Sequence, residues 1–416
     1  MVWVWLPRFD RERVVLALAV LTPPILIGAL ANTLMAVRLS ELTFVASDPE
    51  SLLAALGAFK DAIELTTVAF FVIFGLLSVA ALHATEDAMR GMVAFSTLTL
   101  GFLSFAVYDE WGFGTDLATA QLGIGIAFWG LGWVITMVHL FALLRATPHR
   151  KWTYVAGAVG LYQAIAFFLT LQIAVWINMQ AAAVLLVLLG LLSAVIVFDN
   201  RHDIGDLWGY GLRRSVRLPD VSARRLIIVA LYALIVFGLI GAEYQYHFDY
   251  VPRFALLHYV LLAAMTPVGV VLFGALSERG GRRTLLYGVP LVVAAGLIFQ
   301  RAFTTAWPLA VAEGIMLGAL PYLFQYLAEA TRLLTRGSVY LFAMGAVAVL
   351  GVAGTFAAHF RAWTDWNPQQ MLLLEFALMV VALAIAPQLP ETRAQVSEEE
   401  ELEDYLELAR RVRTSD

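Results

Sequence analysis

Apolar runs long enough to cross a lipid bilayer recur along this chain of 416 residues. A membrane-spanning helix needs roughly 20 predominantly apolar residues. The hydropathy pattern predicts twelve such helices, over residues 14–37, 65–84, 91–108, 118–144, 152–176, 180–198, 226–244, 255–276, 284–300, 305–328, 338–359 and 370–387. Because 61% of the residues are hydrophobic and only 14% are charged, polar side chains cannot cover the surface of a soluble globule. The sequence therefore predicts an all-α integral membrane protein.

The basic residues divide unequally between the two sides of the predicted bundle. An even number of spans places both termini on one side, and 22 of the 27 Lys and Arg residues fall on that side. Short loops rich in Lys and Arg stay in the cytoplasm. We therefore expect a multi-pass protein of the cell membrane with both termini in the cytoplasm.

The longest predicted inner loop, residues 199–225, divides the chain into two sets of six helices. We expect a first half at 14–198 and a second half at 226–388, with a short cytoplasmic segment at 1–13. Residues 389–416 are expected to form a cytoplasmic tail with an amphipathic helix. Several identities at an offset of 186 residues suggest that the two halves are pseudo-symmetric repeats.

A short loop of glycine and charge, GALSERGGRR at residues 274–283, follows the eighth predicted helix. Gly281 and its neighbour supply backbone freedom for a tight turn, and Gly274 permits close approach of another helix. Glu278 can accept hydrogen bonds from the amides of an adjacent helix start or pair with an arginine. The arginines of the loop are Arg279, Arg282 and Arg283. The pattern predicts a latch that holds in one arrangement of the halves and breaks in the other; the alternative is an ordinary tight basic loop.

This loop resembles the signature that the major facilitator superfamily carries between helices two and three and again between eight and nine. Glu278 stands where the family commonly has Asp, and the six-plus-six layout is similar too. The segment 390–393 resembles the one that many members carry after helix twelve, whereas the first-half counterpart at 84–91 lacks the glycine spacing. The resemblance implies the major facilitator fold and secondary transport of a small organic solute or drug-like compound by alternating access. It also implies that Glu329 and Arg336 join the loop in an inner gate.

Ionisable groups inside predicted helices are candidates for binding solute or protons, because a charge in lipid is costly and is normally turned inward. Glu313 is the deepest acid of the second half, although an apolar stripe shares its face, so a structural hydrogen bond is the alternative. Glu243 and His247 lie one turn apart and could carry a proton, or they could simply mark a hydrated helix end. Gln325 is a further candidate. Glu375, in the last predicted helix, is expected to pair locally or to extend toward the headgroups.

Polar and aromatic side chains near the middle of the first half are the remaining candidates for solute contact. Gln163 lies mid-span in the fifth predicted helix. Trp129 and Trp133 lie four residues apart in the fourth. Such an aromatic pair can stack on a solute or can serve only packing. Sparse charge in the spans argues against a highly charged solute.

Other classes of function find little support in the sequence. The chain has no cysteine, which excludes disulfides and thiolate chemistry. The histidines are scattered, and no phosphate-binding loop is present. We therefore expect no metal site, no cofactor, no enzymatic activity and no nucleic-acid partner. The expected partners of a monomer are the bilayer, a small-molecule substrate and, if transport is coupled, protons. The alternative is a non-transporting receptor or scaffold on the same fold. A sealed apolar interface between the halves would favour this alternative, whereas a wet central cavity would favour transport.

Overall fold

The computed structural model describes eleven stretches of the chain. They are residues 11–45, 136–137, 139–140, 143–144, 147, 151–200, 224, 227–236, 255–303, 307–331 and 368–392. The named elements are α1 (Arg11–Val45), α6 (Trp152–Trp176), α7 (Met179–Asp199), α10 (Ala255–Gly280), α11 (Arg282–Phe303), α12 (Trp307–Leu317), α13 (Leu320–Thr331), α15 (Pro368–Ile385) and the 3₁₀ turn η4 (Ala386–Gln388). Residues 227–236 form a further apolar helix. These stretches contain helices and turns but no strand.

The predicted all-α membrane architecture is confirmed in these stretches. α6 matches the predicted span 152–176, and α7 extends the predicted 180–198 by one residue at each end. Within the described residues, four helices are long and apolar enough to cross a membrane, or five if one bent pair counts as a single span. Most of the predicted spans between residues 65 and 144, and the span 338–359, lie outside the described residues.

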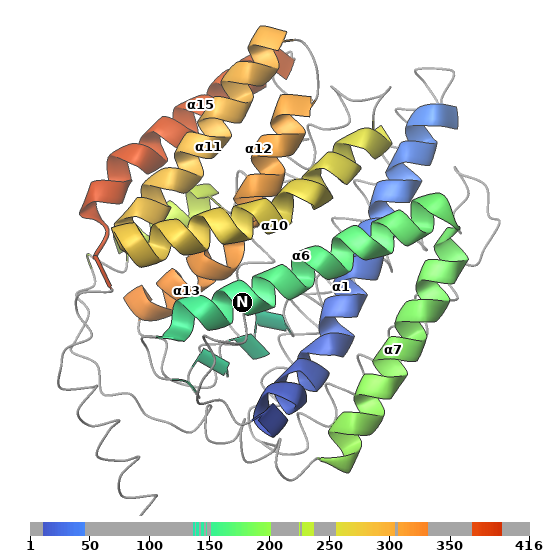
Figure 1. Cartoon of the computed structure of the whole chain (residues 1–416). Helices are drawn as coiled ribbons and strands as arrows, with labels where there is room; N and C mark the ends of the chain where they lie inside the picture. The colour runs from blue at the N-terminus through green and yellow to red at the C-terminus, as the bar shows by residue number, and fades with distance from the viewer. Residues whose placement is uncertain are drawn as a thin grey trace, which may run out of the picture.

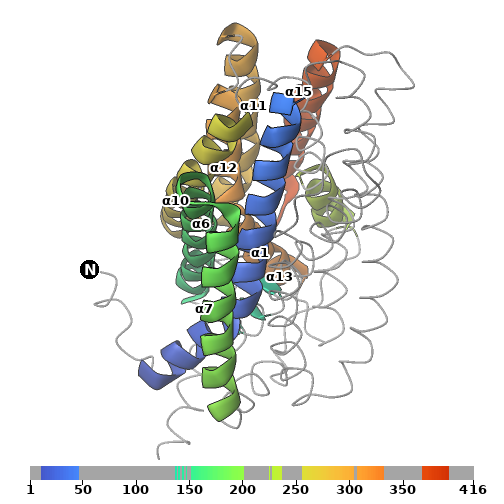
Figure 2. The same cartoon turned by 90° about the vertical axis from the view of Figure 1, so that its right-hand side faces the viewer.

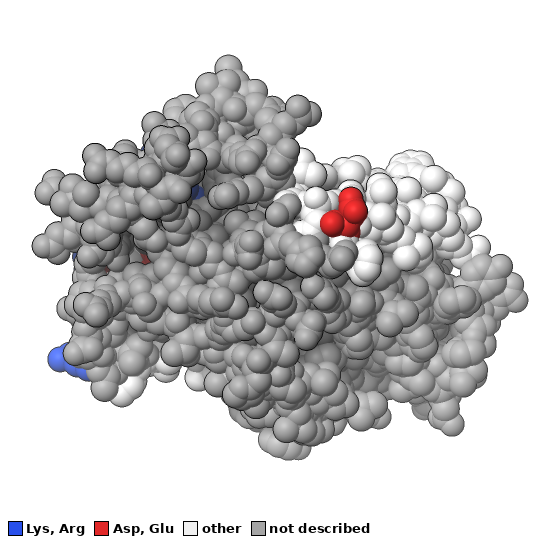
Figure 3. All heavy atoms as spheres, turned by 90° about the horizontal axis from the view of Figure 1, so that it is seen from below, with Lys and Arg blue, Asp and Glu red and all other residues white. Residues whose placement is uncertain are grey.

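The outer face of α7 has the surface of a lipid-facing helix. Its exposed large side chains are apolar and recur at helical spacing, as at Val184, Leu188, Leu192 and Val195. On the face shown in Figure 3, the described atoms that are visible are mostly uncharged. Only lipid or another apolar phase matches such a face.

The helix predicted over residues 305–328 is not continuous, so this part of the prediction is wrong. α12 ends at Leu317, α13 begins at Leu320, and their axes differ by 41°. Pro321 explains the break, because it has no amide hydrogen to donate to the carbonyl of Leu317 and its ring crowds that carbonyl. The amide of Ala319 instead donates to the carbonyl of Met316 at 2.9 Å, a tighter i→i+3 turn.

The first and second predicted halves meet where α6 packs against α10 and α13. α6 and α10 lie side by side across the bundle, with α13 near the start of α6 and the end of α10 (Figures 1 and 2). α1 packs on α6 and α7 on one side of this junction, whereas α11 packs on α12 and α15 on the other. The junction therefore brings the beginning of α6 next to the loop at 274–283.

Glycines allow α10 and α12 to touch backbone to backbone. A Cβ atom added to Gly269 would lie 2.2 Å from the carbonyl oxygen of Ile315, and one added to Gly318 would lie 2.3 Å from the amide nitrogen of Val270. A Cβ on Gly314 would lie 2.5 Å from the carbonyl oxygen of Leu262. Real Cβ atoms do not approach backbone atoms this closely, so these positions require glycine for the packing seen here.

Gly269→Ala is expected to destabilise the protein, because the new methyl group meets backbone rather than a movable side chain. Overpacking of this kind lowers the free energy of unfolding by about 1–3 kcal/mol. Thermal unfolding of the purified protein in detergent measures the effect as a lower midpoint. Gly28→Ala in α1 is the matched control, since its Cβ would have nothing within 4 Å. Equal midpoints for the two variants would contradict the tight contact.

Candidate functional site

Arg282, in the first turn of α11, is the centre of a buried polar network. Its side chain is almost inaccessible, with the whole residue 2% exposed. The guanidinium meets the carboxylate of Glu329 in a two-pronged ion pair, with Nε donating to Oε2 at 3.0 Å and Nη2 donating to Oε1 at 2.9 Å. This fork geometry is the strongest arrangement that arginine makes with a carboxylate.

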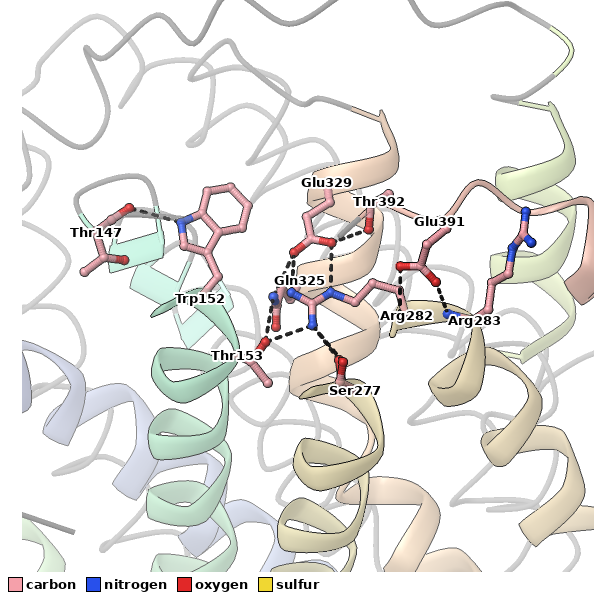
Figure 4. A network of polar contacts seen from close by, with 10 residues as sticks. All are labelled: Thr147, Trp152, Thr153, Ser277, Arg282, Arg283, Gln325, Glu329, Glu391 and Thr392. Atoms are coloured by element: carbon pink, nitrogen blue, oxygen red, sulfur yellow. Dashed lines mark hydrogen bonds and ion pairs between the residues drawn. The ribbon is translucent and has the colours of Figure 1, made fainter. Parts of the chain in front are cut away.

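The remaining nitrogen of Arg282 reaches across to the first predicted half. Its Nη1 donates to Oγ1 of Thr153 on α6 at 2.9 Å and to Oγ of Ser277 on α10 at 2.6 Å. Glu329 also accepts hydrogen bonds from Nε2 of Gln325 at 2.8 Å and from the hydroxyl of Thr392. We call this set the Arg282 network; Figure 4 shows Arg282, Glu329, Gln325, Thr153, Ser277 and Thr392 converging. Partners that satisfy both charges make the burial of the ion pair tolerable.

The segment after α15 closes over the start of α11. The carboxylate of Glu391 accepts hydrogen bonds from the backbone amides of Arg282 and Arg283, each at 3.0 Å (Figure 4). Amides in the first turn of a helix have no partner within the helix and attract negative charge. Glu391 therefore caps α11, a role that the sequence had offered to Glu278.

Two features of this turn require glycine at position 281. Its φ of +79° lies in the left-handed region that favours glycine. A Cβ atom there would also lie 2.9 Å from Oε2 of Glu391. Arg283 extends along the same segment and donates from Nε to the carbonyl of Leu389 at 3.3 Å, while Tyr326 donates to the carbonyl of Pro390 at 3.2 Å. The turn, α13 and the segment after α15 are thus bonded to one another.

Two glycines of α6 form the apolar part of the junction between the predicted halves. A Cβ atom on Gly157 would lie 2.7 Å from Oη of Tyr322, and one on Gly160 would lie 2.6 Å from Cγ of Pro321. Gly274 of α10 approaches the same tyrosine, because its Cβ would lie 2.4 Å from Oη of Tyr322. We call this contact of Gly157 and Gly160 with α10 and α13 the glycine seam. It leaves no room for a larger side chain while the ends of α6, α10 and α13 are together.

The other residues singled out by sequence fall into three groups. Arg279 is exposed, and Glu278 and Gln163 are half-buried. Glu313 is buried away from the network and makes a hydrogen bond with His258 at 3.1 Å between Oε2 and Nε2. Lying outside the described residues are Arg336, Glu243, His247, Trp129 and Trp133. Glu375 is 3% exposed, so of the two alternatives given for it, extension toward the headgroups is wrong.

Sequence reasoning missed Thr153, Ser277 and Glu391. Nothing local marks the two hydroxyl residues, whose importance comes from folding alone. A signal for Glu391 did exist in the segment 390–393, which resembles the one that follows helix twelve in many family members. The fold and the Arg282 network together define a polytopic membrane protein whose helix ends are joined by a water-excluded ion pair.

Solved structures identify this architecture. The human organic anion transporter MFSD10 (TETRAN) superposes with a TM-score of 0.57 at 14% identity, over 91% of this chain and 100% of its own. A partially occluded inward open form of the xylose transporter XylE from E. coli gives 0.62 at 14% identity, over 92% and 99%. The transporter FucP in an outward conformation gives 0.53 at 12% identity, over 89% and 97%. The chain therefore has the fold of the major facilitator superfamily.

Sequence comparison adds nothing to this likeness. No protein-family profile matches the chain, and no curated protein sequence matches it significantly. At 12–14% identity, the structural likeness establishes the fold and leaves the cargo to be inferred from the site.

Proposed function

We propose that the protein is a secondary transporter that moves a small organic solute by alternating access, with the Arg282 network and the glycine seam as its gate at one end. The observation that carries the proposal is the hydrogen bond from Arg282 to Thr153, which joins the predicted second half to the first. The proteins of the same fold named above are transporters of organic anions and of xylose. A gate between two packed halves is the element that alternating access requires.

The composition of the gate favours repeated opening. Arg282, Glu329 and Gln325 belong to the predicted second half and Thr392 to the segment that follows it, so the halves can separate while the ion pair stays intact. This differs from a latch in which the charges themselves must part. Separation breaks the polar contacts of Thr153, with Arg282 at 2.9 Å and with Gln325 at 3.4 Å. Because the guanidinium of Arg282 is charged, its hydrogen bond to Thr153 contributes about 1.5–3 kcal/mol, which is small enough for a reversible gate.

Two spin labels test the proposed motion directly. The chain has no cysteine, so cysteines placed at the exposed positions Tyr154 on α6 and Ala275 on α10 can be labelled without background. Double electron–electron resonance on the reconstituted protein is expected to find two distances between the labels, a short one for the closed gate and a long one for the open gate. We call these positions the gate probe pair.

Solute screening tests the cargo. Pentose sugars and organic anions are the first compounds to try, because proteins of the same fold carry them. A cargo is expected to raise the unfolding temperature, to change the ratio of the two probe distances and to enter liposomes without ATP. A single probe distance under all compounds, with no uptake of any, would favour the receptor or scaffold alternative.

We also propose that the gate end faces the cytoplasm, because the basic residues concentrate on that side. A cysteine placed at the exposed position Arg279 is expected to react with a membrane-impermeant thiol reagent only after cells are permeabilised. Equal labelling of intact cells would reverse the assignment.

A further inference from the structure

Three ionisable side chains from three helices are buried together far from the gate. They are His258 on α10, Glu313 on α12 and Glu375 on α15, and we call them the Glu375 cluster. Their residues are 2%, 3% and 3% exposed. Nε2 of His258 and Oε2 of Glu313 are 3.1 Å apart, and Glu375 interacts electrostatically with Glu313. His258 lies in the first turn of α10, whereas the gate lies at the closing end of the same helix.

The described stretches of α11, α12 and α15 beside the cluster are apolar. Glu313 and Glu375 are the only ionisable residues of α12 and α15, and the ring of Tyr259 meets that of His258 edge-on at 5.6 Å between centroids. On α11, residues 291–296 are apolar, and a Cβ on Gly296 would lie 2.3 Å from that of Ala312, the residue before Glu313. The nearest charged residue of α11 in sequence is Arg301, whose side chain lies outside the description.

Glu375 is the member of the cluster whose burial is not offset by hydrogen bonds to its carboxyl group. Neither of its carboxyl oxygens has a hydrogen-bond partner among the described residues, although both are buried. An ionised carboxylate without donors is very costly in such a place, and a second carboxylate nearby adds repulsion. The protonated acid avoids both costs. A carboxyl group of this kind inside a spanning helix is a site for a proton.

The cluster is connected to the gate by continuous helices. On α10, His258 precedes Ser277 of the Arg282 network by 19 residues, or about 28 Å of helix. A second connection runs from α12 to α13. Glu313 of α12 is followed by the break at Gly318 and Ala319 and then by α13, which carries Gln325 and Glu329. A change of charge between α10, α12 and α15 therefore acts on the two helices that supply most of the gate.

We propose that His258, Glu313 and Glu375 form a proton-binding site whose occupancy sets the balance between the closed and open gate. The proposal rests on the proposed function, since it names the coupling ion and its site. One proton enters from water, is held by the cluster through Glu375 while the gate is closed, and returns to water when the cluster is hydrated in the other arrangement. Only the O–H bond that carries the proton forms and breaks, and no other covalent bond changes.

The gate probe pair tests this proposal in the full-length reconstituted protein. In the otherwise unaltered protein, the ratio of short to long distances is expected to change with pH, by up to about tenfold per pH unit for one linked proton. Glu375→Gln keeps the shape of the side chain but cannot release a proton, so its ratio is expected to stay constant with pH. Asp199→Asn, at the exposed end of α7, is the matched control and is expected to keep the full pH dependence.

The possible results separate this inference from the proposed function. Two distances whose ratio ignores pH would overturn the proton site and leave alternating access standing. An equal pH response in Glu375→Gln and in the parent protein would also overturn the assignment of the site. A single distance under every condition would overturn both proposals.

Infrared spectroscopy gives a second readout that does not require a folded variant at Glu375. The difference spectrum of the unaltered protein between acidic and alkaline buffer is expected to contain the carbonyl band of a buried carboxylic acid. Glu313→Gln is expected to shift this band, because it removes the neighbouring carboxylate. A spectrum without a buried acid band would overturn the proposal, whether or not the Glu375→Gln variant folds.

Discussion

Arg282→Gln is expected to drive the gate open and to reduce transport at least about tenfold. The substitution leaves the carboxylate of Glu329 buried without its ion-pair partner, which costs about 3–5 kcal/mol in a site closed to water. When the gate opens, water reaches the carboxylate and most of this cost disappears. The equilibrium therefore moves toward the open form by about a hundredfold or more. The gate probe pair measures this shift as loss of the short distance.

Two companion variants make this result specific. Thr153→Ala removes an uncharged partner of Arg282 from α6 and is expected to shift the same ratio by only about tenfold, which corresponds to one hydrogen bond from a charged donor of about 1.5 kcal/mol. Arg224→Gln removes an exposed arginine that precedes the helix at 227–236 and is expected to leave the ratio unchanged. If the short distance persisted in Arg282→Gln, this result would contradict the assignment of the ion pair to the gate.

Gly160→Trp is expected to abolish transport by preventing closure of the glycine seam. Even a Cβ at this position would lie 2.6 Å from Pro321 and 3.4 Å from a methyl group of Val270, so an indole cannot fit while α6 contacts α10 and α13. The halves themselves do not need this contact to fold, because α6 also packs on α1 and α7. The variant should therefore purify as a folded protein that shows only the long distance of the gate probe pair.

Ala158→Trp is the matched control for this variant. It lies two residues away on the same helix but on the exposed face, where a tryptophan meets lipid or solvent instead of α10. Normal transport and both probe distances are expected. A Gly160→Trp protein that still transports solute would show that this seam is not closed during the cycle.

Much of the fold was predictable because hydropathy reports directly on burial in lipid. The bounds of α6 agree with the prediction, and α7 differs from it by single residues. Gly274 was expected at a close approach, and a neighbouring tyrosine does contact it. The break between α12 and α13 was missed, although Pro321 gave a local signal, because an apolar run shows length but not continuity of hydrogen bonding.

The site was less predictable because its partners are distant in sequence. Thr153 lies 129 residues before Arg282, and Glu391 lies 109 residues after it, so no spacing rule relates them. The resemblance of the loop to a family signature implied that Glu329 belongs with the arginines, whereas hydropathy alone could not pair them. The two alternatives for Glu375 stayed open for a related reason, since one acid in an apolar helix does not tell which neighbours cover it.

The cap that Glu391 places on α11 has a mechanical consequence. It ties the end of the last described helix to the start of α11, while Thr392 and Tyr326 tie the same segment to α13. α11, α13 and α15 are thus tied together at this end, and in the proposed cycle we expect them to move as one plate. Rocking between the proposed halves is then expected where this plate meets α6, because Gly157 and Gly160 present no side chains there that interlock with α13.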